Sequence, residues 1–320
     1  MIAILNAGVS RRAFTCGAAL MVASLAAGHA SAADAKIMIA FTPTAAAAGI
    51  FNAQAEGFFA KRGLANTELL PQANGVGVVA AVQSGSAQIG SVAAGVFFGA
   101  IEHGLDYVAL GCQSLFGPGT KVLAAIARNG TDIKTAKDFV GKRVAVPGIN
   151  GGHHIMFLEW LRENGVKPTD VTFLEVNHAQ QADVLRGKTV DAVVTAEPYL
   201  TRVVSAGLGT VVSNLNDTKR NMPDAFFMST RAWAAANPAG AAAFQAALQD
   251  GVEFAKSNPA KTQQNTALYL KQELSVVQQA GAQNLCTTDV RKHVGELNAI
   301  MLDLGLAKTP MNADVVVWRP

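Results

Sequence analysis

The chain has 320 residues, of which 50% are apolar and 15% are charged, and its formal net charge is +3 at pH 7. Arg11 and Arg12 lie in a segment that we expect to be removed, and without these two the 26 basic residues fall to 24 against 23 acidic ones. Such a balance gives no electrostatic basis for binding nucleic acid or anionic lipid, so we expect neither as a partner.

Residues 1–32 have the composition of an export signal: a basic start, an apolar run over 13–27 and the small-x-small sequence Ala-Ser-Ala at 30–32. The sequence Ser-Arg-Arg-Ala-Phe at 10–14 resembles the twin-arginine export motif. It departs from that motif at the two positions that follow, which leaves ordinary secretion as the alternative. We expect cleavage after about Ala32 and a periplasmic location.

The next part of the chain alternates strand signals with helix signals. Short runs of apolar and β-branched residues predict strands, and the intervening segments of about ten residues predict helices. This alternation indicates βαβ units and a mostly parallel sheet. The predicted strands are 36–41, 67–70, 89–92 and 107–110, and the predicted helices are one that ends at Gly63, 76–84 and 96–103.

A second set of segments repeats the scheme. The strand 143–146 ends in the glycine-rich loop Pro-Gly-Ile-Asn-Gly-Gly at 147–152, which runs into a helix. The helix 179–185 and the strands 171–176 and 190–194 follow. Two similar α/β lobes explain this repetition better than one large sheet.

Beyond residue 214 the pattern changes, because a short strand at 226–229 is followed almost entirely by helices. We expect this C-terminal helical tail to pack on the first lobe, and we expect the chain to cross between lobes at Pro118 and at 214–224. The predicted organisation is an export signal at 1–32, a first lobe made of 33–117 and 225–320, and a second lobe made of 118–224.

Polar and small residues follow the carboxyl ends of the predicted strands, where open α/β sheets bind their ligands. The loop 147–154 also begins a helix, and the N–H groups there attract anions. None of these loops contains lysine or arginine, so helix N-termini and neutral donors would hold an anion. The predicted ligand-binding residues are Thr42, Thr44, Asn74, Ser91 and Ala93 from the first lobe, and Asn150, Gly151, Gly152, His153 and Glu197 from the second.

These assignments have structural alternatives. Thr42 and Thr44 are also suited to capping a helix, Asn150 to the same role, and Ser91 to a hydrogen bond within a turn. Glu197 could pair within its own lobe; in the cleft, it would instead indicate an ammonium or hydroxyl group on the ligand.

Signatures of enzymes and metal sites are absent from the sequence. It contains no G-x-S-x-G elbow, Walker loop, dinucleotide fingerprint or His-Glu-x-x-His motif. Cys112 and Cys286 could form a disulfide or stay as buried thiols, and the histidines lack ligand spacing. We therefore expect no catalytic residue, no cofactor and no metal.

Four motifs together resemble one family over essentially the whole mature chain. They are Glu-Gly-Phe-Phe-Ala-Lys-Arg-Gly-Leu at 56–64, Val-Gln-Ser-Gly at 82–85 with Gln-Ile-Gly at 88–90, Asp-Phe-Val-Gly-Lys-Arg-Val-Ala-Val-Pro at 138–147, and Gly-Lys-Thr-Val-Asp-Ala at 187–192 with Glu-Pro at 197–198. The sequence resembles the nitrate/sulfonate/taurine group of ABC-transporter substrate-binding proteins, which includes binders of thiamine-pyrimidine precursors. It departs from the usual pattern at Gln88 and Val140.

The resemblance implies a type 2 periplasmic-binding fold, in which the chain crosses twice between two α/β lobes and a small solute binds in the cleft. It implies capture of an anionic or zwitterionic organic solute, such as a sulfonate, taurine, nitrate, an aromatic carboxylate or a pyrimidine precursor. It also implies a monomer that delivers this solute to ABC permease subunits at the inner membrane. The alternatives are an enzyme like the thiamine-pyrimidine synthases, and a ligand-sensing subunit that docks to a receptor.

Overall fold

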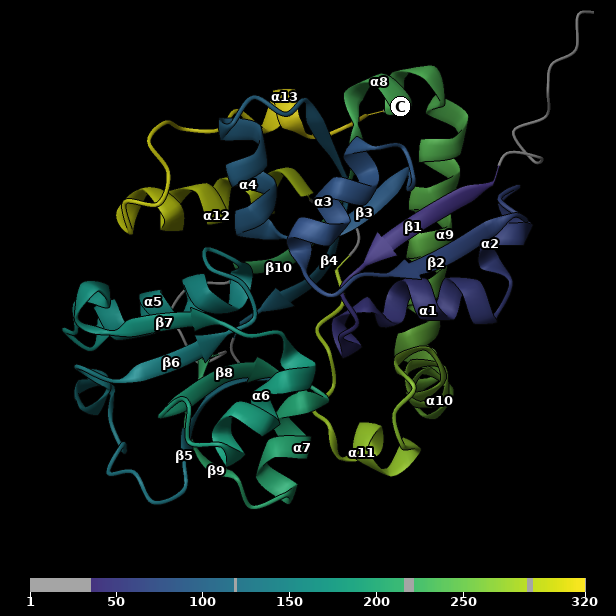
Figure 1. Cartoon of the computed structure of the whole chain (residues 1–320). Coiled ribbons are helices and arrows are strands. Elements are labelled where there is room, and N and C mark those ends of the chain that lie inside the picture. Colours follow the sequence, from purple (N-terminus) through teal and green to yellow (C-terminus); the bar gives the residue numbers. More distant parts are fainter. Residues whose placement is uncertain (1–35, 118–119, 216–221, 287–289, 320) are drawn as a thin grey trace, which may run out of the picture. The chain divides into compact units, whose positions relative to one another are not determined.

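A computed structural model describes residues 36–117, 120–215, 222–286 and 290–319 (Figure 1). The predicted export signal and the predicted crossover at Pro118 lie outside these residues.

The first sheet has the strand order β2-β1-β3-β10-β4. The strands β1, β2 and β3 are parallel, as the βαβ pattern predicts, whereas β10 runs antiparallel between β3 and β4. This sheet is made of β1 (Ile37–Phe41), β2 (Thr67–Pro71), β3 (Ile89–Ala93), β4 (Tyr107–Phe116) and β10 (Met222–Thr230).

The second sheet has the order β7-β6-β8-β5-β9. Its strands β6, β7 and β8 are parallel, and β5 runs antiparallel between β8 and β9. It is made of β5 (Leu123–Arg128), β6 (Arg143–Val146), β7 (Thr172–Glu175), β8 (Ala192–Ala196) and β9 (Gly209–Asn214). We call the first sheet with its helices lobe 1, and the second sheet with its helices lobe 2.

Helices cover both faces of the first sheet (Figure 1), and the apolar residues of this sheet pack in two clusters. Lobe 1 contains η1 (Ala45–Ala47), α1 (Ala48–Ala55), α2 (Phe58–Lys61), α3 (Gly75–Gln83) and α4 (Ala94–Glu102). Lobe 2 contains η2 (Ala136–Phe139), α5 (Gly152–Glu163), η3 (Pro168–Asp170), α6 (His178–Arg186) and α7 (Tyr199–Ser205).

The C-terminal tail is helical, as predicted, and packs mainly on lobe 1. Its helix α9 lies against α1, and α12 lies against β4 and β10 (Figure 1). The helix α11 also contacts α7 of lobe 2. The tail consists of α8 (Arg231–Ala236), α9 (Pro238–Ser257), α10 (Pro259–Leu270), α11 (Leu274–Gln279), α12 (Val290–Asp303) and α13 (Ala313–Val316).

Three features of the sheets differ from the sequence predictions. Both sheets are mixed rather than mostly parallel, and β5 and β9 were not predicted as strands. The sequence of β5, Leu-Ala-Ala-Ile-Ala-Arg, is buried almost throughout and shows no polar alternation, so it lacks the period of a half-exposed strand. In addition, β4 continues to Phe116, six residues beyond its predicted end.

Cys112 and Cys286 are both buried, and they are thiols rather than a disulfide. Burial, together with the neighbouring Cys286, holds the pKa of Cys112 well above its ordinary value. The backbone N–H of Cys286 donates to the carbonyl of Gln113, so the segment around Cys286 is attached to β4.

Candidate functional site

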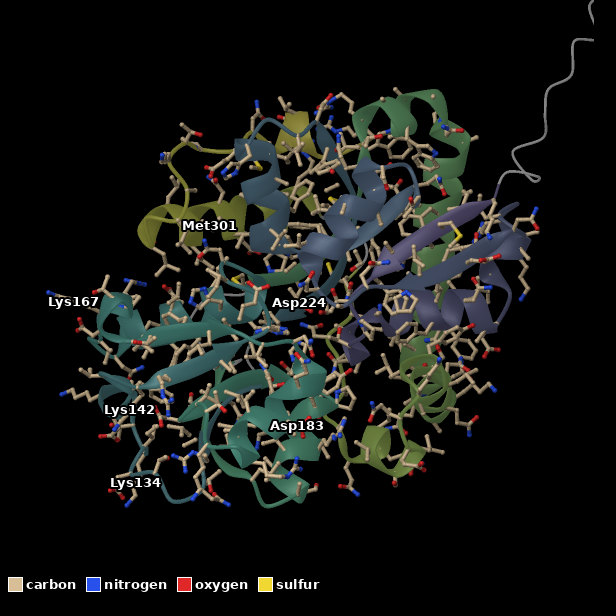
Figure 2. All side chains as sticks on the ribbon, in the orientation of Figure 1. Lys134, Lys142, Lys167, Asp183, Asp224 and Met301 are labelled. Carbon is tan, nitrogen blue, oxygen red and sulfur yellow. The ribbon has the colours of Figure 1, made fainter. Side chains whose placement is uncertain are left out.

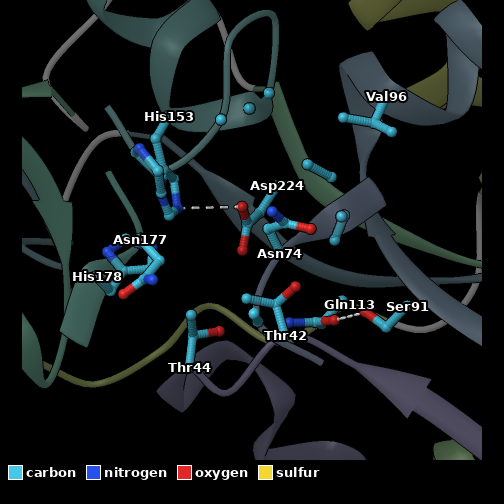
Figure 3. A pocket seen from close by; sticks show the side chains of 18 residues that line it. Thr42, Thr44, Asn74, Ser91, Val96, Gln113, His153, Asn177, His178 and Asp224 are labelled. Carbon is cyan, nitrogen blue, oxygen red and sulfur yellow. Dashed lines mark hydrogen bonds and ion pairs between the residues drawn. The ribbon is translucent and has the colours of Figure 1, made fainter. Parts of the chain in front are cut away.

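A cavity of about 80 Å³ lies between the lobes (Figure 3). One water molecule needs about 10–15 Å³ of such volume, so the cavity has room for a small organic molecule. Eight of the ten predicted ligand-binding residues line it, although they come from four separate segments of the chain. These residues are Thr42, Thr44, Asn74, Ser91, Ala93, Gly151, Gly152 and His153.

Asn150, the ninth predicted residue, is exposed and does not line the cavity. It adopts a left-handed conformation with φ of 59°, and its N–H donates to Nδ1 of His154 at 2.9 Å. The turn therefore directs the backbone of Asn150 into the protein, whereas its glycine neighbours Gly151 and Gly152 contribute to the cavity wall.

Glu197, the tenth predicted residue, is buried but also lies outside the cavity lining. Its carboxylate accepts hydrogen bonds from the backbone N–H of Thr201 at 3.1 Å and from Oγ1 of Thr201 at 2.9 Å. Burial raises the pKa of Glu197. Glu197 therefore pairs within its own lobe, which was the alternative interpretation of the sequence. Its carboxylate accepts hydrogen bonds from the first turn of α7.

Four polar residues that the sequence prediction did not select also line the cavity: Gln113, Asn177, His178 and Asp224. Asn177 and His178 follow the carboxyl end of β7, so the rule that placed the other residues could have selected them. Gln113 and Asp224 lie inside β4 and β10 and carry no such signal. The Ser91 hydroxyl donates to Oε1 of Gln113.

Two histidines line the lobe 2 side of the cavity, and a tyrosine stacks on one of them. The rings of His153 and His178 are 5.0 Å apart, and His178 stacks on Tyr199 at 5.3 Å. His178 shares a hydrogen bond of 3.0 Å with Oγ1 of Thr195, and burial holds its pKa well below the ordinary value. His178 is therefore a neutral wall of the cavity near pH 7.

Four helices begin at the cavity, and two of them lack a capping side chain. The side chains of Asn74 and Asn177 accept from the first turns of α3 and α6, so these two helices are capped. Ala93 and Gly151, the N-cap residues of α4 and α5, have no side chain that can accept a hydrogen bond. The positive ends of α4 and α5 are therefore left for a solute or for another group.

The lobes touch each other around the cavity. The N–H of Ala45 donates to the carbonyl of Glu197 at 3.3 Å, and the Tyr199 hydroxyl donates to the carbonyl of Pro43 at 3.4 Å. On the other side, the carbonyl of Asn150 lies so close to Gly95 that a Cβ atom on Gly95 would overlap it. The structure therefore has contacts between the lobes on both sides of the cavity.

Asp224 is the acidic residue of the cavity lining, and the described lining residues include no lysine or arginine. Its Oδ1 lies 3.4 Å from Nε2 of His153 (Figure 3). Its Oδ2 accepts from the Ser114 hydroxyl at 3.2 Å. In the described part of the chain, no group of three or more His, Cys, Asp or Glu side chains could hold a metal ion.

We expect the protein to lose stability in mild acid because of His154. Burial lowers its pKa from 6.5 to about 4, and its Nδ1 already accepts a hydrogen bond. Since the unfolded chain binds the proton more readily, the free energy of unfolding falls as the pH drops from about 6.5 towards 4, by at most about 3 kcal/mol. We expect His154→Gln to reduce the difference in Tm between pH 7 and pH 5.

The control for this prediction is His103→Gln, because His103 is an exposed histidine. It should retain the difference in Tm of the unmodified protein. An equal difference in both variants would contradict the role of His154.

The NMT1/THI5-like family model matches residues 44–262, more than half of the chain. The nitrate/nitrite binding protein NrtA of Nostoc is 24% identical over 243 residues, which cover 68% of this chain and 53% of NrtA. The bicarbonate transport ATP-binding protein CmpC of Synechocystis is 24% identical over 215 residues, which cover 62% of this chain and 32% of CmpC. The chain thus spans about half and about a third of these curated relatives.

Among solved structures, the alkanesulfonate-binding protein SsuA from Xanthomonas axonopodis pv. citri, bound to MOPS, superposes with a TM-score of 0.75. The alignment covers 89% of this chain and 99% of SsuA at 18% sequence identity. At this identity the likeness establishes the fold alone: two mixed sheets with helices in an α/β arrangement. None of the described helices is long and apolar enough to cross a membrane.

Proposed function

Because the chain belongs to the NMT1/THI5-like family and has the two-lobed α/β fold of periplasmic binding proteins, we propose that it captures a small solute between its lobes for an ABC importer. The single observation that carries this proposal is the cavity, because both lobes contribute to its wall. A solute held by both lobes makes more contacts in the closed form than in the open form.

The proposed solute is small and organic, and it carries an anionic group. The uncapped N-terminus of α4 supports this, since it attracts negative charge without a lysine or arginine. The names of the relatives also support it, because nitrate and alkanesulfonates are anions. The neutral donors Thr42, Thr44 and Ser91 would contribute hydrogen bonds.

The proposed mechanism is a shift between open and closed forms. A ligand shifts such an equilibrium only by its difference in affinity for the two forms, and contacts from both lobes supply that difference. The hydrogen bonds from Ala45 to Glu197 and from Tyr199 to Pro43 join the lobes in this structure, and opening of the cleft would break them. A permease could then recognise the closed form as the occupied one.

We propose further that the protein works as a periplasmic monomer without catalytic activity, after removal of an export signal at about Ala32. The proposed lobes are residues 33–117 with 225–320, and residues 118–224, except that residues 222–224 belong to β10 and so to lobe 1. The proposed partners are ABC permease subunits at the inner membrane, in line with the transport names of the relatives.

A thermal-shift screen tests solute capture. We expect at least one solute among sulfonates, nitrate, amino acids, aromatic carboxylates and pyrimidines to raise the Tm, because a ligand that binds only the folded state stabilises it. The same solute should reduce the radius of gyration in small-angle scattering. A solute that binds with an unchanged scattering profile would contradict closure, and a turnover product would contradict a pure binding function.

A further inference from the structure

Asp224 lies near the N-terminus of α5, which would otherwise be a second place in the cavity for an anion. A Cβ atom on Gly152, the first residue of α5, would be 2.8 Å from the backbone carbonyl oxygen of Asp224 and 3.5 Å from its Oδ1. The carboxylate therefore faces the uncapped N-terminus of α5 and already supplies negative charge there. An anionic group of the solute would be repelled from this side of the cavity, which leaves the N-terminus of α4 for it.

The contacts of Asp224 leave it able to accept another hydrogen bond. The distance between its Oδ1 and Nε2 of His153 is 3.4 Å. A charge-assisted hydrogen bond is usually shorter, at about 2.7–2.9 Å. The 3.2 Å from the Ser114 hydroxyl is also longer than the usual distance of about 2.7–2.8 Å. An ionised carboxylate has about four acceptor positions, and these two partners use two of them loosely.

Burial makes a further partner for this carboxylate favourable. The residue is only 7% exposed, and a buried carboxylate is costly unless it is paired and hydrogen-bonded. The described lining residues provide no lysine or arginine for this purpose. A cation that arrives with the solute would supply the missing charge.

We propose that the solute carries a protonated amino group, which pairs with Asp224 in the closed cleft. This inference rests on the proposed function and narrows it: the solute is a small zwitterion, with its amino group at Asp224 and its anionic group towards α4. An amine stays protonated near pH 7, and its N–H groups match the free acceptor positions of the carboxylate.

Pairs of solutes that differ only at the amino group test the inference on the unmodified protein. Taurine with isethionate, and β-alanine with 3-hydroxypropanoate, replace the amine by a hydroxyl group and keep the anion. These pairs are measured beside the wider screen by thermal shift and calorimetry. We expect an amino solute to bind at least tenfold more tightly than its hydroxyl counterpart.

Replacement of the carboxylate gives the second measurement. Asp224→Asn should weaken binding of the amino solute by about 10- to 100-fold, the usual effect of losing a hydrogen bond to a charged group, and should remove the preference over the hydroxyl counterpart. The control Asp183→Asn removes an exposed carboxylate that pairs with Arg186 on α6, and it should leave the affinity unchanged (Figure 2).

The outcomes separate this inference from the proposed function. If the protein binds and closes on hydroxyl or purely anionic solutes as tightly as on amines, the amino group is ruled out while solute capture stands. If Asp224→Asn binds the amino solute unchanged, Asp224 is not its partner. If no solute in the screen binds, both proposals fail. Should Asp224→Asn not fold, the comparison of solute pairs on the unmodified protein still decides.

Discussion

Replacing Gly251 by alanine is expected to destabilise the protein by about 3 kcal/mol, the upper end of the usual cost of overpacking. Gly251 lies on α9 where this helix crosses α1, and a Cβ atom there would overlap the carbonyl of Gly49 and lie 3.1 Å from the backbone nitrogen of Ala53. Both neighbours are backbone atoms, so neither can move aside by changing a rotamer. Urea denaturation followed by circular dichroism measures the loss.

Gly240→Ala is the matched control, because it makes the same change in the same helix. The nearest atoms to a Cβ on Gly240 are 3.8 Å away, which is an ordinary contact. Alanine also favours a helix over glycine by about 1 kcal/mol, so Gly240→Ala should be neutral or stabilising. Equal denaturation midpoints for the two variants would show that close packing of α9 on α1 does not contribute to stability.

Replacing Gly95 by alanine is expected to hold the lobes apart and to weaken solute binding at least tenfold. Gly95 lies in the first turn of α4 in lobe 1, and a Cβ atom there would overlap the carbonyl of Asn150 and lie 2.5 Å from Cδ1 of Ile155, both in lobe 2. Because the obstacle exists only where the lobes meet, the open form should fold normally. Scattering with the solute found in the screen should show less compaction than for the unmodified protein.

Gly99→Ala is the control for closure, since it lies on the same helix with no atom within 4 Å of its added Cβ. It should close and bind normally. Unchanged compaction and affinity in Gly95→Ala would show that the contact between Gly95 and the carbonyl of Asn150 can adjust to an added methyl group. A large loss of stability instead would mean that it belongs to the folded core, in which Phe97 of α4 and Ile155 of α5 share one apolar cluster.

Local signals were sufficient for the elements that alternate along the chain. The strands near 37, 67, 89 and 143 and the helices that follow them appear where hydrophobic spacing predicts them. The sequence also identified the loops at the carboxyl ends of these strands, because that position depends only on the order of strand and helix. Eight of the ten selected residues line the cavity for this reason.

Local signals failed where distant segments meet. The strand β10 enters the first sheet between β3 and β4 only after the chain has formed lobe 2, so no pattern near Asp224 indicates that it faces a cavity. The turn at Asn150 and the hydrogen bonds of Glu197 similarly depend on backbone geometry. The sequence by itself thus determined the family, the two lobes and most of the loops that surround the cavity. The tertiary structure decided the charge inside it, because Asp224 reaches the helices α4 and α5 through an antiparallel pairing of strands more than a hundred residues apart.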